Sequence, residues 1–230
     1  MKTIGLIGGM SWQSTVTYYN IINEVTKERL GGFHSSKCIL YSVDFHEIEE
    51  CQSRGEWEKS GEILADAAKN LQMAGADFIV ICTNTMHKVI DIIQRNITIP
   101  ILHIAETTAN ELHKQGIKTV ALLGTKYTMQ QDFYKSKIMI GGIEVIIPME
   151  HDINLINSII FEELCLGIIR KQSKDELLRI IQLLSDEGAE GIILGCTEIG
   201  LLVDQADSCV PIFDTTLIHA TEAALLAVEG

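Results

Sequence analysis

Proline is scarce in this chain, and the features that mark disordered, membrane-spanning or exported proteins are missing. Only 3 of the 230 residues are proline, and no serine- or glycine-rich linker interrupts the sequence, so we expect no disorder outside the extreme termini. No apolar run approaches the roughly 20 residues that a membrane-spanning helix needs. The first residues lead directly into a predicted strand, without a signal peptide. These absences predict a folded protein that is not inserted in a membrane.

Basic clusters and paired cysteines are missing too. The formal net charge is −13, with no lysine- or arginine-rich patch to offset it, which argues against binding to nucleic acids or membrane surfaces. Because salt screens distant charges within about 8 Å, local groups can still bind an anion. The 6 cysteines are widely spread and form no CxxC pair, which indicates free thiols in a cytoplasmic protein.

Hydrophobic residues make up 47% of the chain, enough for a real core in one domain or two small lobes. Short apolar runs alternate with helical periodicity along its whole length. The predicted strands are 3–8, 37–43, 77–82, 99–103, 118–124, 143–147, 190–195 and 210–214. Helices are expected to begin near Ser11, Phe45, Glu56, Thr85, Glu106, Tyr127, Asp152, Ser173, Glu198 and Thr215. Continuous apolar strands between helices indicate parallel sheets covered on both faces, an α/β fold.

One short segment occurs twice in the chain. Residues 75–85 (GADFIVICTNT) and 188–198 (GAEGIILGCTE) both end a buried strand in a small polar residue before a helix. The repeat aligns Thr83 with Cys196, at an offset of 113 (196 minus 83). Two further pairs follow in the same order, 4–8 with 120–124 and 99–102 with 210–213. Short Val/Ile/Leu strands resemble one another in any α/β protein, but three pairs at nearly constant offset favour a duplication.

A duplicated α/β fold predicts two pseudo-symmetric lobes, each a parallel sheet flanked by helices, with the active site in a cleft between them. We expect residues 1–102 with 212–230 to form lobe one and residues 103–211 to form lobe two. Ligands of open parallel sheets bind outside the carboxyl ends of the strands. The sequence therefore predicts Thr83 and Cys196 on opposite sides of one ligand, as chemistry on both faces of a substrate carbon requires.

Cys196 is the strongest candidate for chemistry. It follows Gly195, which allows close approach of a ligand, and precedes Thr197 and Glu198 at a predicted helix start. Because a helix N-terminus stabilises a thiolate, we expect the Cys196 pKa to fall from about 8.5 toward neutrality. Such a thiolate can act as a nucleophile or a general base. Packing in the interior is the expected role of the other cysteines, which are Cys38, Cys51, Cys82, Cys165 and Cys209.

The Asn84-Thr85 and Thr197-Glu198 pairs supply hydroxyls, an amide and free backbone N–H groups. These groups suit a bound carboxylate, and simple helix capping is the alternative. The turn at residues 8–11 offers similar donors. It matches neither the G-x-G-x-x-G fingerprint nor a P-loop, so no nucleotide cofactor is indicated.

The histidines show no metal-ligand spacing. His46 and His87 are not spaced from another His or Cys as zinc ligands would be, so no metal is predicted and both are expected to have ordinary polar or capping roles. Trp57 is expected to anchor the core.

At these positions the chain resembles the cofactor-independent aspartate/glutamate racemase superfamily. The resemblance covers nearly the whole length and rests on the turn at 8–10, on Asn84-Thr85-Met86-His87 and on Gly195-Cys196-Thr197-Glu198. Stretches 42–52 and 160–167 are similar to bacterial L-aspartate/glutamate-specific racemases of the broad-specificity amino-acid racemase group. The resemblance implies a PLP-independent enzyme without cofactors that acts on a small amino acid, as a homodimer.

The resemblance also implies a mechanism. Members typically place a cysteine on each face of the substrate α-carbon, but here Thr83 stands in the first position. Members with this Thr/Cys pair are selective for the L-enantiomer. A threonine hydroxyl has too high a pKa to lose its proton and act as a base, but it can donate a proton. Cys196 is therefore expected to remove the α-proton, and Thr83 is expected to return one. The substrate contacts implied by the resemblance are Met10, Gln52, Asn84, Thr85, Thr197 and Glu198.

Several related activities stay open. The same superfamily contains Cys-dependent decarboxylases, hydantoin racemases and maleate isomerases, and a non-catalytic two-lobed protein could bind a small anion in the same place. Some aspartate racemases carry a lysine close to the position of Cys165, where it contacts the side-chain carboxylate. No basic residue stands there in this chain, so the choice between aspartate and glutamate is left open.

Overall fold

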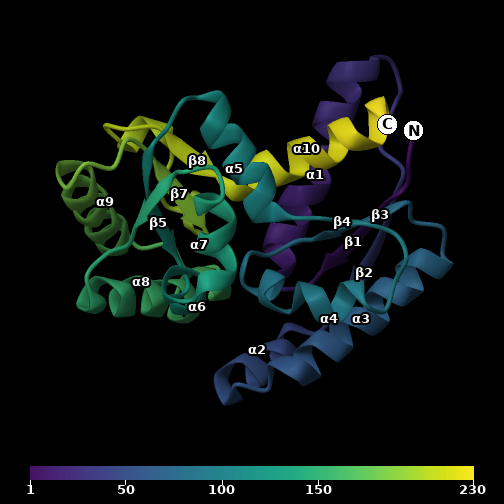
Figure 1. The fold of residues 1–230 in the computed structure, drawn as a ribbon, viewed down its shortest axis with the longest axis horizontal. Helices are drawn as coiled ribbons and strands as arrows, with labels where there is room; N and C mark the ends of the chain where they lie inside the picture. Colours follow the sequence, from purple (N-terminus) through teal and green to yellow (C-terminus); the bar gives the residue numbers. More distant parts are fainter. The chain divides into compact units, whose positions relative to one another are not determined.

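The computed structural model describes residues 1–230 and contains two compact units (Figure 1). The first comprises Met1–Ile104 with Thr216–Gly230, and the second comprises Ala105–Thr215. Each unit has one four-stranded parallel sheet, with the order β2-β1-β3-β4 in the first and β6-β5-β7-β8 in the second. This confirms the predicted α/β fold with two pseudo-symmetric lobes. No helix is long and apolar enough to cross a membrane.

The first unit follows the predicted alternation of strands and helices. Its strands are β1 (Ile4–Gly8), β2 (Cys38–Ser42), β3 (Phe78–Ile81) and β4 (Ile101–Leu102). Its α-helices are α1 (Trp12–Leu30), α2 (Phe45–Arg54), α3 (Trp57–Met73), α4 (Ile90–Gln94) and α10 (Thr215–Glu229), which begins one residue before the unit boundary. A 3₁₀ segment, η1 (Thr85–Val89), precedes α4.

The second unit repeats this order. Its strands are β5 (Thr119–Gly124), β6 (Glu144–Ile146), β7 (Ile192–Gly195) and β8 (Ile212–Asp214). Its α-helices are α5 (Ile104–Lys114), α6 (Lys126–Gln130), α7 (Asp132–Met139), α8 (Glu150–Glu162) and α9 (Lys171–Asp186). Short 3₁₀ segments are η2 (Leu164–Leu166), η3 (Ile199–Leu201) and η4 (Gln205–Asp207). All eight predicted strands are therefore observed, with ends that differ by at most two residues.

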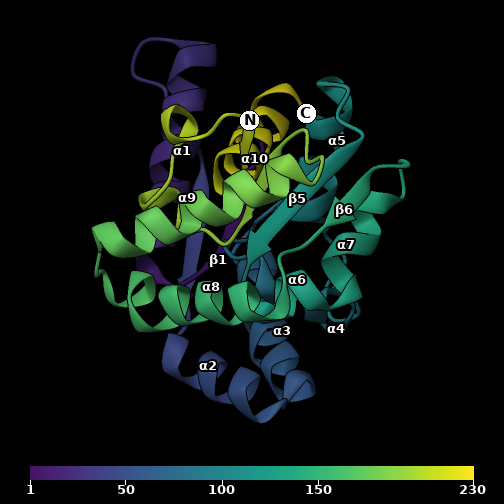
Figure 2. The same ribbon diagram turned by 90° about the vertical axis from the view of Figure 1, so that its left-hand side faces the viewer.

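The core of the first unit lies on both faces of its sheet, because successive strand side chains point to opposite sides. Ile79 and Ile81 pack in a cluster that includes residues of α2, α3 and η1. Phe78, Val80 and Cys82 pack in a second cluster with α1 and the alanine-rich face of α10. Figure 1 and Figure 2 show these two helix layers on either side of the sheet. Cys82 is therefore a packing residue, as predicted.

Similar hydrogen bonds occur in both units where the chain passes from a helix to an inner strand of the sheet. After α3, the Asp77 N–H donates to the Thr3 carbonyl, and the Asp77 carboxylate accepts from the Thr3 N–H at 2.6 Å. After α9, the Glu190 N–H donates to the carbonyl of residue 119, and its carboxylate accepts from the Lys118 N–H at 2.7 Å. The Glu190 side chain, one methylene group longer than that of Asp77, makes the same kind of connection, which supports the duplication.

Two further pairs match between the units. Gly75 and Gly188 both turn the chain with positive φ, +97° and +107°, a conformation that L side chains rarely adopt. Gln94 and Gln205 each bridge the chain that enters the last strand of their sheet. Each amide donates to a backbone carbonyl and accepts from the N–H two residues later, at 3.1 and 3.3 Å for Gln94 and at 3.3 and 2.8 Å for Gln205. Such side-chain bridges are not properties of short apolar strands in general.

Two predicted helices are shorter than their sequences suggested. The helix expected at Thr85 begins as the 3₁₀ segment η1, and the one expected at Glu198 is only the three-residue turn η3. The chain near Tyr127 forms two helices, because Gln131 adopts an extended conformation between α6 and α7. The short η3 matters for chemistry, since a single 3₁₀ turn supplies little of the dipole that a full helix directs at its N-terminus.

Candidate active site

Thr83 and Cys196 lie at equivalent places in their units. Thr83 comes two residues after the end of β3, and Cys196 follows directly after β7. Both strands are central, since β3 pairs with β1 and β4 while β7 pairs with β5 and β8. Parallel sheets bind ligands at this carboxyl edge. Thr83 is half-buried, whereas Cys196 exposes 7% of its surface.

Two of the predicted contact residues of the first unit, Gln52 and Met10, lie close to Met86, three residues after Thr83. Gln52, on α2, donates from its side-chain amide to the Met86 sulfur at 3.1 Å. Met10 belongs to the same buried cluster as Met86. Asn84 and Thr85 are buried next to Thr83, and the Asn84 side chain makes no capping hydrogen bond to η1. Simple helix capping is thus not the role of Asn84.

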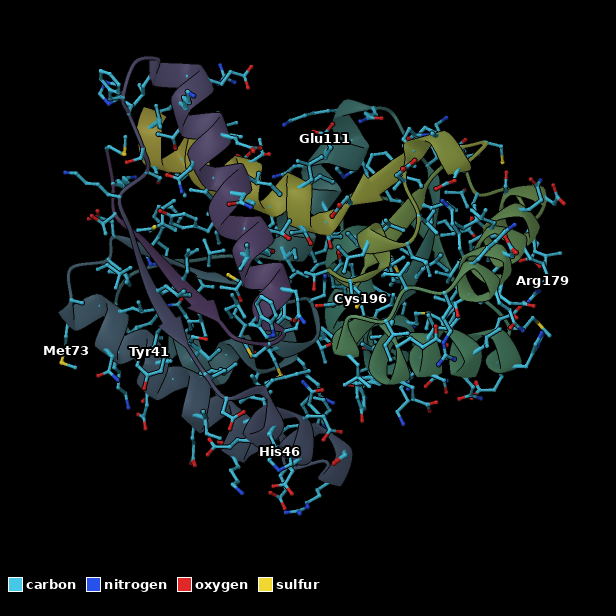
Figure 3. All side chains as sticks on the ribbon, turned by 180° about the vertical axis from the view of Figure 1, so that it is seen from behind. Tyr41, His46, Met73, Glu111, Arg179 and Cys196 are labelled. Atoms are coloured by element: carbon cyan, nitrogen blue, oxygen red, sulfur yellow. The ribbon has the colours of Figure 1, made fainter.

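The predicted residues of the second unit form a tight cluster around one carboxylate oxygen. The Cys196 thiol, labelled in Figure 3, donates to Glu198 Oε2 at 3.1 Å. The Thr197 hydroxyl donates to the same oxygen at 2.7 Å. Glu198 is only 5% exposed, so few water molecules compete for this oxygen. The carboxylate holds both donors in fixed directions.

Burial raises the pKa of the Cys196 thiol well above its ordinary value, and electrostatic interaction with the Glu198 carboxylate and then with the Cys165 thiol raises it further. The expectation of a lowered pKa is therefore wrong. Its physical basis was a helix start beyond Cys196, but η3 is a single turn and the nearest charged group is a carboxylate. Cys196 carries its proton at neutral pH unless a ligand changes this environment.

Cys165 was expected to be a packing residue, and the structure gives it a second property. It lies in η2, half-buried, and burial, followed by the charge of Glu198, raises its pKa to about 12. Cys165 therefore lies within electrostatic reach of Glu198 and Cys196. No spacing in the sequence indicates this approach, because η2 follows α8 and Cys196 follows β7.

The other cysteines are all free thiols. Cys51 is buried and Cys38 is half-buried. Cys209 is exposed, so its assignment to the interior is wrong. It lies between η4 and β8, where its thiol approaches the polar side chains of Gln182 and Ser185 at 3.6 and 3.7 Å.

His87 was expected to have an ordinary polar or capping role, but the structure buries its ring. It is 1% exposed. Its ring is hydrogen-bonded to the Thr83 carbonyl, after β3, and to the Ile104 N–H, after β4. His46, by contrast, is exposed at the start of α2 and has the ordinary polar role expected of it (Figure 3). Nowhere in the chain are three or more His, Cys, Asp or Glu side chains arranged to hold a metal.

Replacing Glu198 by glutamine is expected to lower the pKa of Cys196. The carboxylate raises this pKa through its charge and by accepting the thiol hydrogen bond, so its removal lets the thiolate form at lower pH. We expect the alkylation profile of Cys196 to move to lower pH in this variant. The measurement is the rate of Cys196 alkylation by iodoacetamide as a function of pH, followed by mass spectrometry of the peptide. Glu162→Gln, exposed on α8, is the matched control, and an unchanged or raised profile for Glu198→Gln contradicts the assignment.

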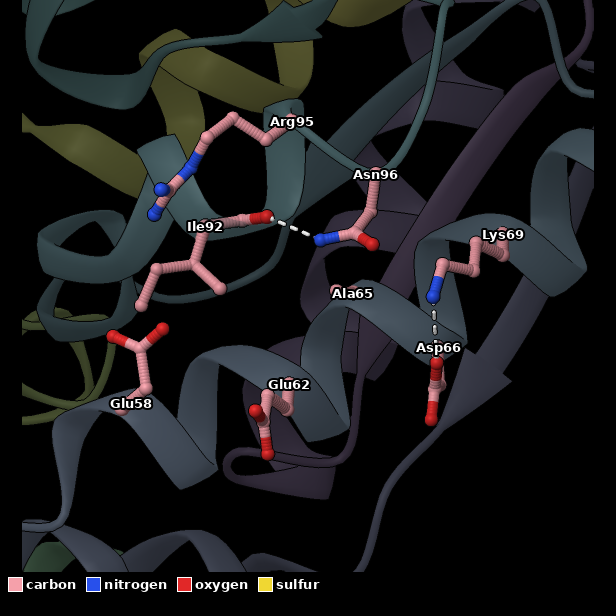
Figure 4. A pocket seen from close by; sticks show the side chains of 8 residues that line it. All are labelled: Glu58, Glu62, Ala65, Asp66, Lys69, Ile92, Arg95 and Asn96. Carbon is pink, nitrogen blue, oxygen red and sulfur yellow. Dashed lines mark hydrogen bonds and ion pairs between the residues drawn. The ribbon is translucent and has the colours of Figure 1, made fainter.

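A pocket elsewhere in the first unit contains none of these residues. It has a volume of about 500 Å³ and lies between α3 and the end of α4 (Figure 4). Its charged side chains, including Glu58, Glu62 and Arg95, are exposed, and Lys69 pairs with Asp66 at 3.1 Å. Solvated charges of mixed sign do not select one ligand.

Comparison with known proteins gives consistent results. Residues 7–223 match the family model described as Asp/Glu/Hydantoin racemase. A crystal structure of a candidate Asp/Glu racemase from Yersinia pestis is 54% identical with a TM-score of 0.92, covering 99% of this chain and 100% of that one. An aspartate racemase homologue from Pyrococcus horikoshii OT3 is 39% identical with a TM-score of 0.85, covering 99% of both chains. The broad specificity amino-acid racemase RacX of Bacillus subtilis (strain 168) is 27% identical over 99% of this chain and 100% of its own length.

Proposed function

The chain belongs to the Asp/Glu/hydantoin racemase family, and we propose that it racemises L-aspartate or L-glutamate without a cofactor. In this proposal Cys196 removes the α-proton and Thr83 returns a proton to the opposite face of the carbon. The observation that carries it is the equivalence of the two residues at central strand ends of a duplicated fold. The active protein is proposed to be a cytoplasmic homodimer.

An acidic amino acid suits both the chemistry and the relatives. RacX is an amino-acid racemase of broad specificity, and the Pyrococcus protein is an aspartate racemase homologue. Removal of an α-proton leaves a carbanion whose charge spreads into the carboxylate, so donors placed at that carboxylate stabilise the transition state. Asn84, Thr85 and Thr197 are proposed to supply these donors, with Met10 and Gln52 closing the binding surface.

Thiolate formation is proposed to depend on the substrate. The thiol pKa is raised partly by the nearby Glu198 carboxylate. A cationic α-ammonium group bound beside Glu198 would offset that charge and favour the thiolate, because an opposite charge within about 4–6 Å favours ionisation. Glu198 also accepts the hydrogen bond of the Cys196 thiol, with Oε2 at 3.1 Å from Sγ. This carboxylate is thus proposed both to bind the substrate and to set the proton position on Cys196.

The test is solvent deuterium exchange. With L-aspartate or L-glutamate in deuterated buffer, we expect the α-proton NMR signal to disappear while the D-enantiomer accumulates on chiral chromatography. Carbon dioxide release would instead indicate a decarboxylase, and loss of maleate absorbance an isomerase. A ligand-induced thermal shift without α-exchange in any amino acid of a small panel would reject catalysis and favour a binding protein.

A further inference from the structure

Three histidine rings lie together in the interior of the first unit. His87 and His103 have ring centroids 4.7 Å apart, and His87 and His219 are separated by 5.8 Å. Tyr18, from α1, meets His219 edge-on at 5.7 Å. All four side chains are buried. A cluster of imidazoles in the interior requires that their nitrogens be hydrogen-bonded in compatible protonation states.

The partners of His87 determine its tautomer. The Ile104 N–H can only donate, so Nε2 of His87, 3.2 Å away, accepts. The Thr83 carbonyl can only accept, so Nδ1, 2.9 Å away, carries the proton and donates. A second proton on Nε2 would face the Ile104 N–H and break that bond. His87 is therefore held as the neutral Nδ1–H form.

His219 is fixed in the opposite tautomer. Its Nε2 lies 3.0 Å from the Leu102 carbonyl and must donate, so its Nδ1 accepts from the Tyr18 hydroxyl at 2.8 Å. Burial, followed by the neighbouring imidazole charge, lowers the pKa of both His87 and His219, in the latter case to about 3. Both rings use both nitrogens in these bonds, so neither is available to a metal ion.

We propose that His87 is a positioning residue for Thr83, an inference that rests on the proposed function. Thr83 stands in a tight turn in which its N–H donates to the Ile81 carbonyl at 2.9 Å, while its own carbonyl accepts from His87. The backbone of Thr83 is thus held on both sides, which fixes the direction of its Cα–Cβ bond and so limits where its hydroxyl can point. Through Ile104, the same ring ties this turn to the chain just after β4.

Two substitutions separate the two bonds of the ring. In His87→Asn the side-chain NH₂ can occupy the position of Nδ1 and keep the bond to the Thr83 carbonyl, while the acceptor for Ile104 is lost. In His87→Gln the amide oxygen can reach the position of Nε2 and keep the bond to Ile104, while the donor to Thr83 is lost. If His87 only fills space, the two variants should behave alike.

The readout is the ratio of two reactions of one active site. Racemisation needs proton removal and proton return. Elimination from an L-aspartate analogue with chlorine on the β-carbon needs removal only. In that elimination the α-proton goes to Cys196, the C–H electron pair forms the double bond, chloride leaves, and the enamine hydrolyses to oxaloacetate and ammonium. We expect His87→Gln to lose racemisation about 10- to 100-fold relative to elimination, and His87→Asn to keep the wild-type ratio, as should the exposed control His46→Gln.

Imidazole nitrogen NMR separates this inference from the proposed function. If the wild type shows no racemisation, the proposed racemase function is rejected. The positioning role of His87 is then tested by two NMR observations, the Nδ1–H tautomer of His87 and the chemical shift of the Thr83 methyl group. That resonance should move in His87→Gln and stay in place in His87→Asn. Equal loss of racemisation and elimination in both variants, or an Nε2–H or protonated His87 in the wild type at neutral pH, would overturn the proposal.

Discussion

Cys196→Ser is expected to abolish α-proton exchange and racemisation of the L-amino acid, with a loss of about 10²- to 10⁴-fold, the usual contribution of a positioned acid–base group. A serine hydroxyl is a far weaker acid than a thiol and does not form the base that the reaction needs. The variant should fold normally, because the hydroxyl can still donate to Glu198, as the thiol does at 3.1 Å. Exchange is measured by NMR in deuterated buffer, and folding by thermal unfolding.

Cys209→Ser is the matched control for this experiment. Cys209 belongs to the same unit but is exposed, so its substitution should leave exchange and racemisation unchanged. Elimination from the β-chloro analogue should also vanish in Cys196→Ser, since that reaction begins with the same proton removal. Full exchange activity in Cys196→Ser would exclude Cys196 as the base and would end the mechanism proposed above.

The strands could be predicted because buried parallel strands leave a strong local signal. Phe78–Ile81 and Ile192–Gly195 are continuous apolar runs, each followed by a small polar residue. Their repetition at a nearly constant offset also predicted two pseudo-symmetric lobes, and the two sheets have matching strand orders. The local strand propensity and the observed sheets agree here, as expected for a minimally frustrated sequence.

The electrostatic state of Cys196 could not be predicted in the same way. The sequence placed Glu198 two residues further on, which suggested a helix start that would stabilise a thiolate. Whether that carboxylate turns outward or back onto the thiol depends on the local fold after β7. In the structure it turns back, and the expected pKa change reverses its sign.

The histidine cluster shows a second limit. His87, His103 and His219 are separated in the sequence by segments of very different length, and none has the spacing of metal ligands. His219 joins the other two rings only because α10 returns to pack against the first sheet. The short motif that contains His87 could be found in the sequence. The proposed role of His87 depends on its hydrogen bonds to Thr83 and Ile104, which the sequence does not show.

Thr83→Ala is expected to separate the two proton transfers. Without the hydroxyl, no group returns a proton on that face, so racemisation should fall by about 10²- to 10⁴-fold. Elimination from the L-β-chloro analogue should continue near the wild-type rate, because it requires only Cys196. Chiral chromatography measures the first reaction and oxaloacetate formation the second. Thr17→Ala, exposed on α1, should change neither.

Thr83→Cys should restore racemisation and raise the initial rate from the D-enantiomer above that of the wild type. A thiol at position 83 can ionise and remove the α-proton from that face, which a threonine hydroxyl does poorly. Catalysis leaves the equilibrium between enantiomers unchanged, so the selectivity of the Thr/Cys pair is a property of initial rates and not of the final mixture. Wild-type racemisation by Thr83→Ala would show that another group, or water, returns the proton. An unchanged D-to-L rate in Thr83→Cys would show that this position does not face the α-carbon.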